Sequence, residues 1–248
     1  MKVVSVSSLK GGVGKTCLAL FMGQELAAQG RRVLLVDADA NNNLTDYLFR
    51  DEAELDQIEA RNLYHVLKGA ASLGDCIRPR SFKIGRESFG LDALPCTPEL
   101  ARATIEFSSN PGSVLRFRKQ LRELPYDLIL CDTGPSFSFE LRAILHAADL
   151  VLCPVRPDRW TLQGFDIIGW EVRTVGEGLD KAPRLLAVPS IVTESQELAL
   201  RASRAGKFLS KTAIRKSAAI DTAATKGKPL TAQKARAQYL AIARELSR

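Results

Sequence analysis

The segment Lys10-Gly11-Gly12-Val13-Gly14-Lys15-Thr16 carries residue types that bind a nucleoside triphosphate. Its glycines allow backbone turns that other residues avoid, which brings N–H groups against phosphate oxygens. Lys15 is placed to reach the β and γ phosphates, and Thr16 to offer its hydroxyl to Mg²⁺. The strict pattern G-x-x-x-x-G-K-[ST] fails because Leu9 stands where the first glycine belongs. The compact form with an added Lys10 predicts a nucleotide site; a tight structural turn is the alternative.

Three aspartates follow apolar runs that have the composition of buried strands. Asp37 and Asp39 lie just after the run 32–36, and Asp132 follows the run 127–131. Ligands of open parallel sheets bind at the carboxyl ends of the strands, so these acids are expected near the phosphate loop. A carboxylate there suits Mg²⁺, and we predict that Asp132 holds the ion directly or through a water. The alternatives are an asparagine-rich capped turn after residue 36 and a buried capping aspartate at Asp132.

Short apolar runs alternate with longer helical stretches, which predicts an α/β fold with a doubly wound, mainly parallel sheet flanked by helices. A helix is expected over 15–29, ended by Gly30, and another over 231–246. Residues 50–125 have a weaker pattern and predict helices and short edge strands attached to the sheet. The predicted strands are 3–6, 32–36, 127–131, 150–155, and 185–188 followed by 191–192.

The composition bounds the class of protein. The 248 residues, 46% hydrophobic and 25% charged, predict a single domain over 1–248 with a sizeable core. The net charge of +7 favours polyanionic partners such as nucleic acid or an anionic membrane surface. Five widely spaced cysteines indicate buried thiols in a reducing compartment. With only two histidines, they argue against a zinc or iron–sulfur site within one chain. No run of about 18 apolar residues occurs, so the default location is the cytoplasm.

The loop K-G-G-V-G-K-T resembles the deviant Walker A loop of the ParA/MinD superfamily of P-loop ATPases. The resemblance implies ATP and Mg²⁺ as cofactors and a homodimer that forms on ATP binding. It implies that Lys10 and Lys15 act in catalysis, with Lys10 reaching the nucleotide of the partner subunit. Asp39 would orient or activate the attacking water, and Asp37 would support the Mg²⁺ shell together with Thr16 and Asp132. The implied nucleotide-binding residues are Gly11, Gly12, Val13, Gly14, Lys15, Thr16, Cys17 and Ile214.

Other segments extend the resemblance over most of the chain and favour ParA-type partition ATPases. They include 62–67, 77–79, 154–155 with 162–164, and 220–229. The sequence departs from the family pattern at Ala40, Asn41 and Gly134, where Pro, Gln and Pro are usual, and at Ala213, where a Pro is usual beside the adenine. ParA-type proteins bind double-stranded DNA without sequence specificity and have a ParB-type centromere-binding partner. Because the first strand begins at residue 3, no N-terminal helix-turn-helix extension is expected.

The basic residues near the C-terminus predict the DNA-binding surface. At about 100° per residue, Arg201, Arg204, Lys207 and Lys211 fall within one third of a helix circumference and form one basic stripe. Arg215 and Lys216 follow and are included in the predicted surface. Contacts of such residues to phosphates would make affinity steeply salt-dependent. The location expected is therefore nucleoid-associated; an ordinary solvated helix face is the alternative.

The terminal helix separates two classes of positioning ATPase. MinD-type relatives bind membrane through a C-terminal amphipathic helix, which needs bulky apolar residues along one face. Here most apolar residues of 231–246 are alanines, and Tyr239, Leu240, Ile242 and Leu246 are the bulky ones. We therefore predict a helix that packs against the sheet, with no membrane partner. A MinD-like ATPase, a ParA-like ATPase that positions a protein cargo, and a metabolic amidase or synthetase remain the alternatives.

Overall fold

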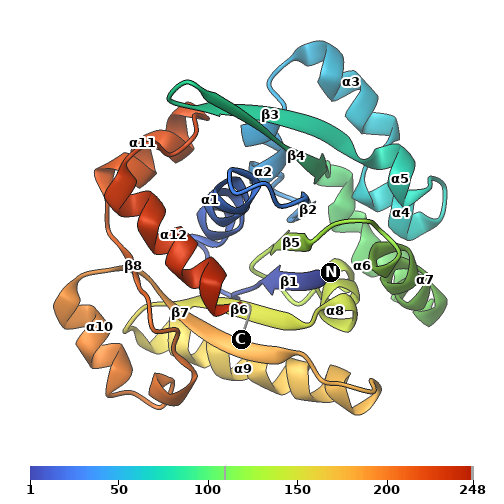
Figure 1. The fold of residues 1–248 in the computed structure, drawn as a ribbon. Helices are drawn as coiled ribbons and strands as arrows, with labels where there is room; N and C mark the ends of the chain where they lie inside the picture. The colour runs from blue at the N-terminus through green and yellow to red at the C-terminus, as the bar shows by residue number, and fades with distance from the viewer. Residues whose placement is uncertain (109, 247–248) are drawn as a thin grey trace.

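The structure is a computed structural model that describes residues 1–108 and 110–246. The strands are β1 (Lys2–Val6), β2 (Val33–Ala38), β3 (Arg78–Ile84), β4 (Glu87–Leu94), β5 (Leu128–Thr133), β6 (Leu150–Val155), β7 (Arg184–Val192) and β8 (Ile214–Arg215). Within the described residues they form one sheet in the order β3-β4-β2-β5-β1-β6-β7-β8 (Figure 1). Only β3 and β4 pair antiparallel, so the predicted mainly parallel sheet is confirmed.

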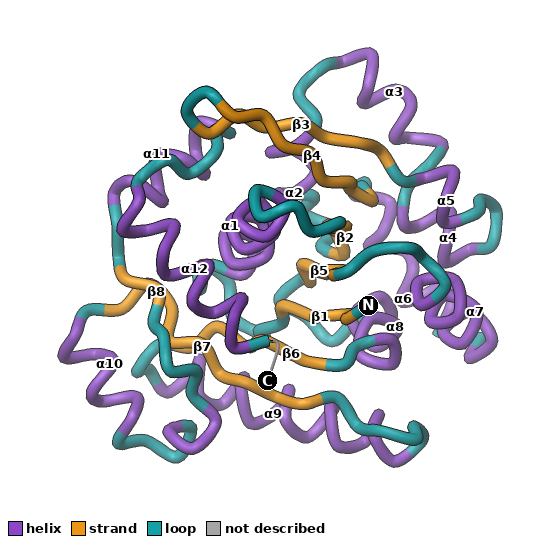
Figure 2. The backbone as a smooth tube through the Cα atoms, viewed as in Figure 1, coloured by secondary structure: helices purple, strands orange, loops and turns teal. Residues whose placement is uncertain are grey.

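Helices cover both faces of the sheet (Figure 2). They are α1 (Lys15–Ala27), α2 (Asn43–Leu48), α3 (Glu52–Ala60), α4 (Leu63–Lys68), α5 (Leu73–Cys76), α6 (Ala103–Phe107), α7 (Pro111–Arg122), α8 (Phe139–Ala147), α9 (Arg159–Glu177), α10 (Glu194–Arg201), α11 (Ala218–Lys226) and α12 (Gln233–Glu245). Two 3₁₀ turns, η1 (Pro98–Arg102) and η2 (Gly206–Phe208), complete them. On one face α1 and α12 share a core with the strands, and on the other α4, α6, α7 and α8 do so. The sheet is therefore the middle of three layers.

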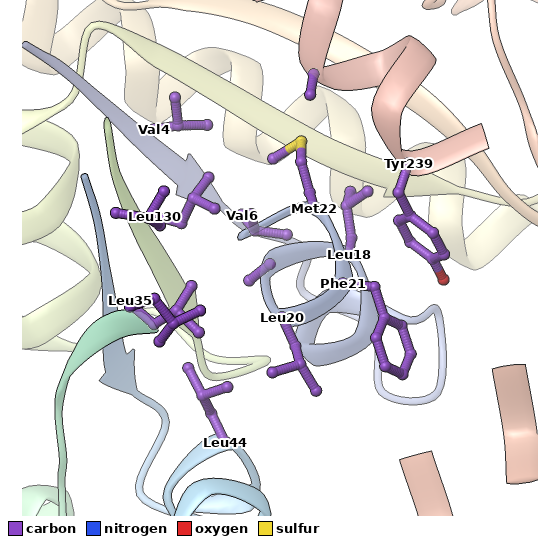
Figure 3. Packing of buried hydrophobic residues seen from close by; sticks show 14 of the residues in the cluster. Val4, Val6, Leu18, Leu20, Phe21, Met22, Leu35, Leu44, Leu130 and Tyr239 are labelled. Carbon is purple, nitrogen blue, oxygen red and sulfur yellow. The ribbon is translucent and has the colours of Figure 1, made fainter. Parts of the chain in front are cut away.

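The central strands are buried on both faces, as continuous apolar runs predict. In β1, Val4 and Val6 face the core under α1, and Val3 faces the opposite core. Figure 3 shows the α1 side of this packing, with Met22 close to Val4 and Val6. Helix α1 lies so close to the sheet that a Cβ at Gly23 would fall 2.7 Å from Leu35 Cδ2. This packing fixes α1, and with it the loop that precedes α1.

Two predicted helices differ from the structure in detail. Helix α1 ends at Ala27, two residues earlier than predicted, because the chain turns there and Gly30 takes a left-handed φ of 78°. The terminal helix packs chiefly on α1, where the rings of Tyr239 and Phe21 meet edge to face at 5.5 Å between centroids. Its predicted packing against the sheet is confirmed at the edge strand β8, which α12 also contacts.

The middle of the chain forms the far edge of the sheet, as predicted. Strand β4 pairs in parallel with β2, and β3 folds back on it as a hairpin. The turn contains Gly85, whose φ of 63° suits glycine. The cysteines are all free; Cys131 and Cys153 are buried, as predicted. None of the helices in 1–108 and 110–246 has the length and apolar character needed to cross a membrane.

Candidate nucleotide-binding and hydrolysis site

The glycine-rich loop joins β1 to α1 at the carboxyl edge of the sheet. Gly12 and Gly14 have φ values of 71° and 84°, which are left-handed conformations that favour glycine. Gly14 is the N-cap of α1, and no described side chain caps this helix, so its first N–H groups are available to an anion. A Cβ at Gly14 would also lie 3.1 Å from Ser190 Oγ. The loop is thus built for close approach of phosphate to backbone.

Strand β7 holds the loop from the side. The Ser190 hydroxyl donates to the Val13 carbonyl at 2.7 Å, and both residues are buried. The next residue, Ile191, has a φ of 58° and its side chain would touch a Cβ at Gly14. A positive φ at a β-branched residue is a strained conformation of order 1–3 kcal/mol. Sequence patterns gave no sign of this contact, because Ser190 and Val13 are far apart in the chain.

Lys15 is a buried cation, with 7% of its surface exposed. Its ammonium donates to the Lys10 carbonyl at 3.3 Å. Burial lowers the pKa of Lys15, and the nearby charges of Asp132 and Asp39 oppose that change. An ammonium held in place inside a loop of free N–H groups is positioned to pair with phosphate oxygens. Lys10 itself is exposed.

Asp132 ends β5 beside Asp37, its register partner on β2. Its side chain is fully buried, and neither carboxylate oxygen has a hydrogen-bond partner among the described residues. Burial raises the pKa of Asp132 to about 8, the charge of Asp37 adds to the rise, and Thr16 and Lys15 oppose it. A buried carboxylate without a partner is costly unless something pairs with it. The two free oxygens of Asp132 are therefore suited to binding a cation.

Mg²⁺ is a cation that suits these carboxylate oxygens. No group of three or more His, Cys, Asp or Glu side chains in the described residues could hold a metal by itself. Mg²⁺ is usually held by one or two carboxylates together with phosphate oxygens and waters, so a complete protein cage is not required. Asp132 and the Thr16 hydroxyl supply the donors of that kind. When bound, the ion would neutralise charge on the phosphates.

Asp37 and Asp39 are held in different ways. Asp37 Oδ2 accepts from both the Thr45 N–H and the Thr45 hydroxyl at 2.7 Å, and its Oδ1 accepts from the Asp39 N–H. Burial raises the pKa of Asp37 to about 6, and the Thr45 bonds oppose the rise. Both oxygens of Asp37 are thus already engaged, and its Oδ2 anchors α2. Its predicted support of a magnesium shell stays a prediction, and its partner Thr45 was not predicted.

Asp39 faces the site from the loop after β2. Its Oδ1 accepts from the Asn41 backbone N–H and side-chain amide, both at 3.0 Å. A Cβ at Gly134 would lie 3.2 Å from the same oxygen, so the loop after β5 touches Asp39. Asn41 stands at the departure from the family pattern, and here it orients the carboxylate. Asp39 Oδ2 accepts no hydrogen bond from a described residue, so this oxygen is available to a further ligand.

A cavity of about 500 Å³ joins these groups. Among the predicted residues it is lined by Gly11, Gly12, Gly14, Lys15, Thr16, Cys17 and Asp39. Val13 is buried behind the loop, and Ile214 lines a separate cavity of about 30 Å³ that also touches Gly14 and Cys17. Tyr47 and Arg50, which were not predicted, line the larger cavity. Tyr47 belongs to α2 and Arg50 follows it, so the anchoring of α2 by Asp37 places both residues at the cavity.

We expect Asp132→Asn to stabilise the ligand-free protein above neutral pH while it weakens magnesium-dependent nucleotide binding. The folded-state pKa of Asp132 lies above its ordinary value of 3.8, so stability falls as pH rises from about 4 to about 8. Asparagine carries no charge, so the variant should keep the stability that the wild type loses. For a buried group without a partner we expect this to be about 1–3 kcal/mol of unfolding free energy. Thermal melts of both proteins at pH 5 and pH 8 measure it. An increase in melting temperature of Asp132→Asn over wild type that is larger at pH 5 than at pH 8 would contradict this expectation.

The predicted basic stripe does not lie on one helix. Helix α10 ends at Arg201, and the chain then turns, because Gly206 packs directly on the Arg201 backbone. Arg204 pairs with Asp166 at 2.5 Å, and Arg201 and Arg215 both pair with Glu197. The single-helix prediction was wrong. Of the six residues of the predicted DNA-binding surface, those that are exposed and make no ion pair with described residues are Lys207, Lys211 and Lys216.

A mainly parallel sheet with a glycine-rich loop between β1 and α1, and an unpaired carboxylate on the adjacent strand, defines a P-loop nucleotide hydrolase. A family model described as AAA domain matches residues 1–182. The chain is 35% identical over 186 residues to the chromosome-partitioning ATPase Soj of Thermus thermophilus, covering 75% of this chain and 67% of that protein. The chain belongs to the ParA/Soj family of partition ATPases, and it is an ATP hydrolase of that class.

Solved structures share the whole fold at lower identity. A plasmid partition protein from Borrelia burgdorferi bound to AMPPNP aligns with a TM-score of 0.83 and 19% identity, covering 99% of this chain and 98% of that one. A cobyrinic acid a,c-diamide synthase from Mycobacterium smegmatis, bound to an ATP analogue and magnesium, aligns with a TM-score of 0.82 and 24% identity, over 100% and 94%. The fold is therefore common to partition proteins and a biosynthetic enzyme.

Proposed function

We propose that this chain is a ParA-type partition ATPase that forms a homodimer on binding Mg²⁺ and ATP. In that state it binds double-stranded DNA without sequence specificity and associates with the nucleoid. A ParB-type centromere-binding protein stimulates hydrolysis and releases the dimer from DNA. Family membership supports the partition role, and the cavity with Lys15, Thr16 and Asp132 supports ATP and Mg²⁺ as ligands.

The observation that carries the proposal is the placement of Lys10. Its side chain is exposed at the loop, and its ammonium makes no ion pair or hydrogen bond with a described residue, while its carbonyl accepts from Lys15. Its own subunit thus makes no use of this cation. In a dimer whose sites face each other, the Lys10 ammonium would reach the partner's nucleotide and neutralise charge that develops on the transferred phosphoryl group.

Hydrolysis by this site assigns separate tasks to separate groups. Lys15 and the N–H groups of the loop bind the phosphates, and Asp39 holds the attacking water in line. Asn41 fixes the direction of the Asp39 carboxylate, and Gly134 places the loop after β5 against it. A partner protein that shifts either loop would change the position of Asp39. We expect ParB-type stimulation to act through this contact.

We expect the protein with ATP and Mg²⁺ to be retained on random-sequence duplex DNA at low salt, with affinity that falls linearly in log–log form as salt rises. Lys10→Ala should still bind ATP but remain monomeric and lose retention. Gel filtration and DNA retention, each with ATP and with ADP, measure these results. Lys119→Ala on the exposed side of α7 is the matched control.

Each outcome is decisive for one part of the proposal. Wild-type protein that is not retained at low salt rejects DNA binding, and a Lys10→Ala dimer that equals wild type rejects the shared-cation arrangement. Co-sedimentation with anionic liposomes would favour the MinD-like alternative. That alternative is disfavoured by α12, whose Tyr239 and Ile242 are buried against the core. Stimulation by a protein other than a ParB-type partner would favour a protein cargo.

A further inference from the structure

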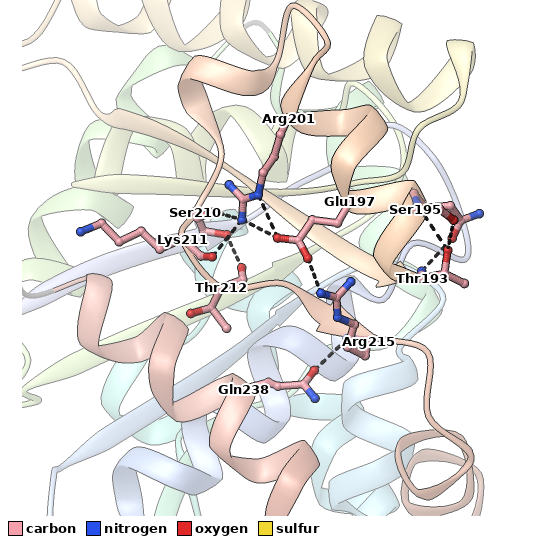
Figure 4. Close-up of polar contacts among 10 residues, drawn as sticks. Thr193, Ser195, Glu197, Arg201, Ser210, Lys211, Thr212, Arg215 and Gln238 are labelled. Atoms are coloured by element: carbon pink, nitrogen blue, oxygen red, sulfur yellow. Dashed lines mark hydrogen bonds and ion pairs between the residues drawn. The ribbon is translucent and has the colours of Figure 1, made fainter.

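Glu197 of α10 binds two arginines from different parts of the chain (Figure 4). Its Oε1 accepts from Arg201 Nε at 2.9 Å and Nη2 at 2.5 Å. Its Oε2 pairs with Arg215 Nη2 at 2.5 Å. The Glu197 side chain is 13% exposed and each arginine side chain is 38% exposed. The carboxylate therefore lies beneath two guanidinium groups that are partly open to solvent.

Neighbouring backbone strengthens this arrangement. Arg201 Nη2 also donates to the Lys211 carbonyl at 2.9 Å, and the Arg215 N–H donates to Gln238 Oε1 at 2.7 Å. Glu245 accepts from the Lys211 N–H at 2.9 Å. These bonds hold the segment 210–215 between α10 and α12. Both arginines are thereby drawn inward, onto the molecule rather than out from it.

The pairing limits what the two arginines can give to a polyanion. Carboxylates and phosphates bind guanidinium through the same paired N–H donors, so one group competes with the other. Two cations and one anion leave a local charge of only +1. The exposed ammonium groups of Lys207, Lys211 and Lys216 have no such restraint. The predicted DNA-binding surface thus contains two kinds of cation. Its three lysines make no ion pair with described residues, whereas the two arginines must leave the Glu197 carboxylate before they can contact phosphate.

Arg215 is incompletely satisfied in this arrangement. Its Nη1 is buried and has no acceptor among the described residues. A buried donor without an acceptor is destabilising, so the contact with Glu197 leaves part of the hydrogen-bonding capacity of Arg215 unused. Because Nη1 is buried, a phosphate oxygen can accept from it only after Arg215 leaves Glu197. Release of Arg215 would therefore expose a donor that has no acceptor in the present arrangement.

We propose that Glu197 is an internal competitor of DNA phosphates and sets how tightly the ATP-bound protein holds DNA. This inference rests on the proposed DNA binding. On binding, Arg201 and Arg215 exchange the Glu197 carboxylate for phosphate oxygens of the duplex. Glu197 thereby keeps the affinity for DNA lower than it would be if both arginines were unpaired. A lower affinity suits a protein that must leave DNA after hydrolysis. Glu197 is a positioning residue and takes no part in ATP hydrolysis.

The test compares Glu197→Gln with Glu194→Gln, an exposed residue on the same helix, so both variants add one net charge. Fluorescence anisotropy on a random-sequence duplex, with a non-hydrolysable ATP analogue and rising salt, gives affinity and salt slope. We expect Glu197→Gln to bind about tenfold more tightly than wild type, with a slope steeper by about 1–2 as one or two more phosphates are contacted. Glu194→Gln should change both quantities much less. Basal ATPase activity should be unchanged in both.

Other results separate this inference from the function on which it rests. If wild type binds DNA and Glu197→Gln equals Glu194→Gln or binds more weakly, the competitor role is rejected and DNA binding stands. If wild type does not bind at all, the proposed function fails instead. In the background Arg201→Gln with Arg215→Gln, Glu197→Gln should have no effect beyond that of Glu194→Gln. Side-chain NMR of Arg201 Nε–H in wild type is independent of variant folding; a signal unmoved at saturating DNA also overturns the proposal.

Discussion

Replacing Lys15 by alanine is expected to weaken ATP binding by at least about thirtyfold and to abolish measurable hydrolysis. Removing one partner of a buried charge pair costs about 2–5 kcal/mol, and each 1.4 kcal/mol is a factor of ten. Lys15 is the buried cation at the loop, and its direction is fixed by its bond to the Lys10 carbonyl. No flexible surface lysine could replace it. Isothermal titration with an ATP analogue and Mg²⁺ measures the loss.

The control for this variant is Lys234→Ala, an exposed residue of α12. It should bind nucleotide as wild type does. Far-UV circular dichroism should show that Lys15→Ala is folded, because the burial that lowers the pKa of Lys15 makes the charged side chain a cost to the ligand-free protein. An affinity within threefold of wild type would show that the loop N–H groups alone bind the triphosphate, against the role assigned here.

Replacing Asp39 by alanine is expected to lower hydrolysis by about 10²–10⁴-fold while ATP binding and dimerisation persist. That range is the usual contribution of a positioned general base. The phosphate contacts come from the loop and Lys15, none of which Asp39 touches by hydrogen bond, so nucleotide affinity should change little. The variant should therefore accumulate as an ATP-bound dimer. Single-turnover hydrolysis and gel filtration with ATP give the two readings.

Two further variants make this result specific to the carboxylate. Asp39→Asn keeps an acceptor for Asn41 but has no charge, and it should lose hydrolysis as fully as alanine. Asp46→Ala removes another acid that lines the same cavity, paired with Asn42, and should retain most activity. If Asp39→Ala elutes as a monomer with ATP under all conditions, the separation of binding from hydrolysis is wrong.

The phosphate loop and the central strands were predictable because their signals are local. Gly12 and Gly14 adopt left-handed backbone angles that favour glycine, and the run 150–155 is apolar throughout because both faces of β6 are covered. Parallel pairing then places Asp132 beside Asp37 without further information. The predicted roles of Asp39 and Lys10 came from family resemblance, and the experiments above test them.

The contacts between distant segments were not predictable. Thr45 anchors Asp37, Ser190 holds Val13, and Glu197 binds Arg215, yet none of these pairs has a fixed spacing in the sequence. The basic stripe failed for a related reason. Periodicity treats residues after Arg201 as helical, while the close packing of Gly206 on the Arg201 backbone turns the chain. The sequence located the basic residues of this region. Their ion-pair partners could be identified only from the folded structure.

The bond between Ser190 and Val13 has a consequence for communication within the molecule. Only Ile191 and Val192 separate Ser190 from Thr193, the N-cap of α10. Ile191 is the strained link, and the pairing of β7 with β8 shifts register at the same point. We therefore expect a displacement of the phosphate loop to reach the start of α10 through three peptide units. By that short covalent route, the arrival of a triphosphate would alter the position of α10.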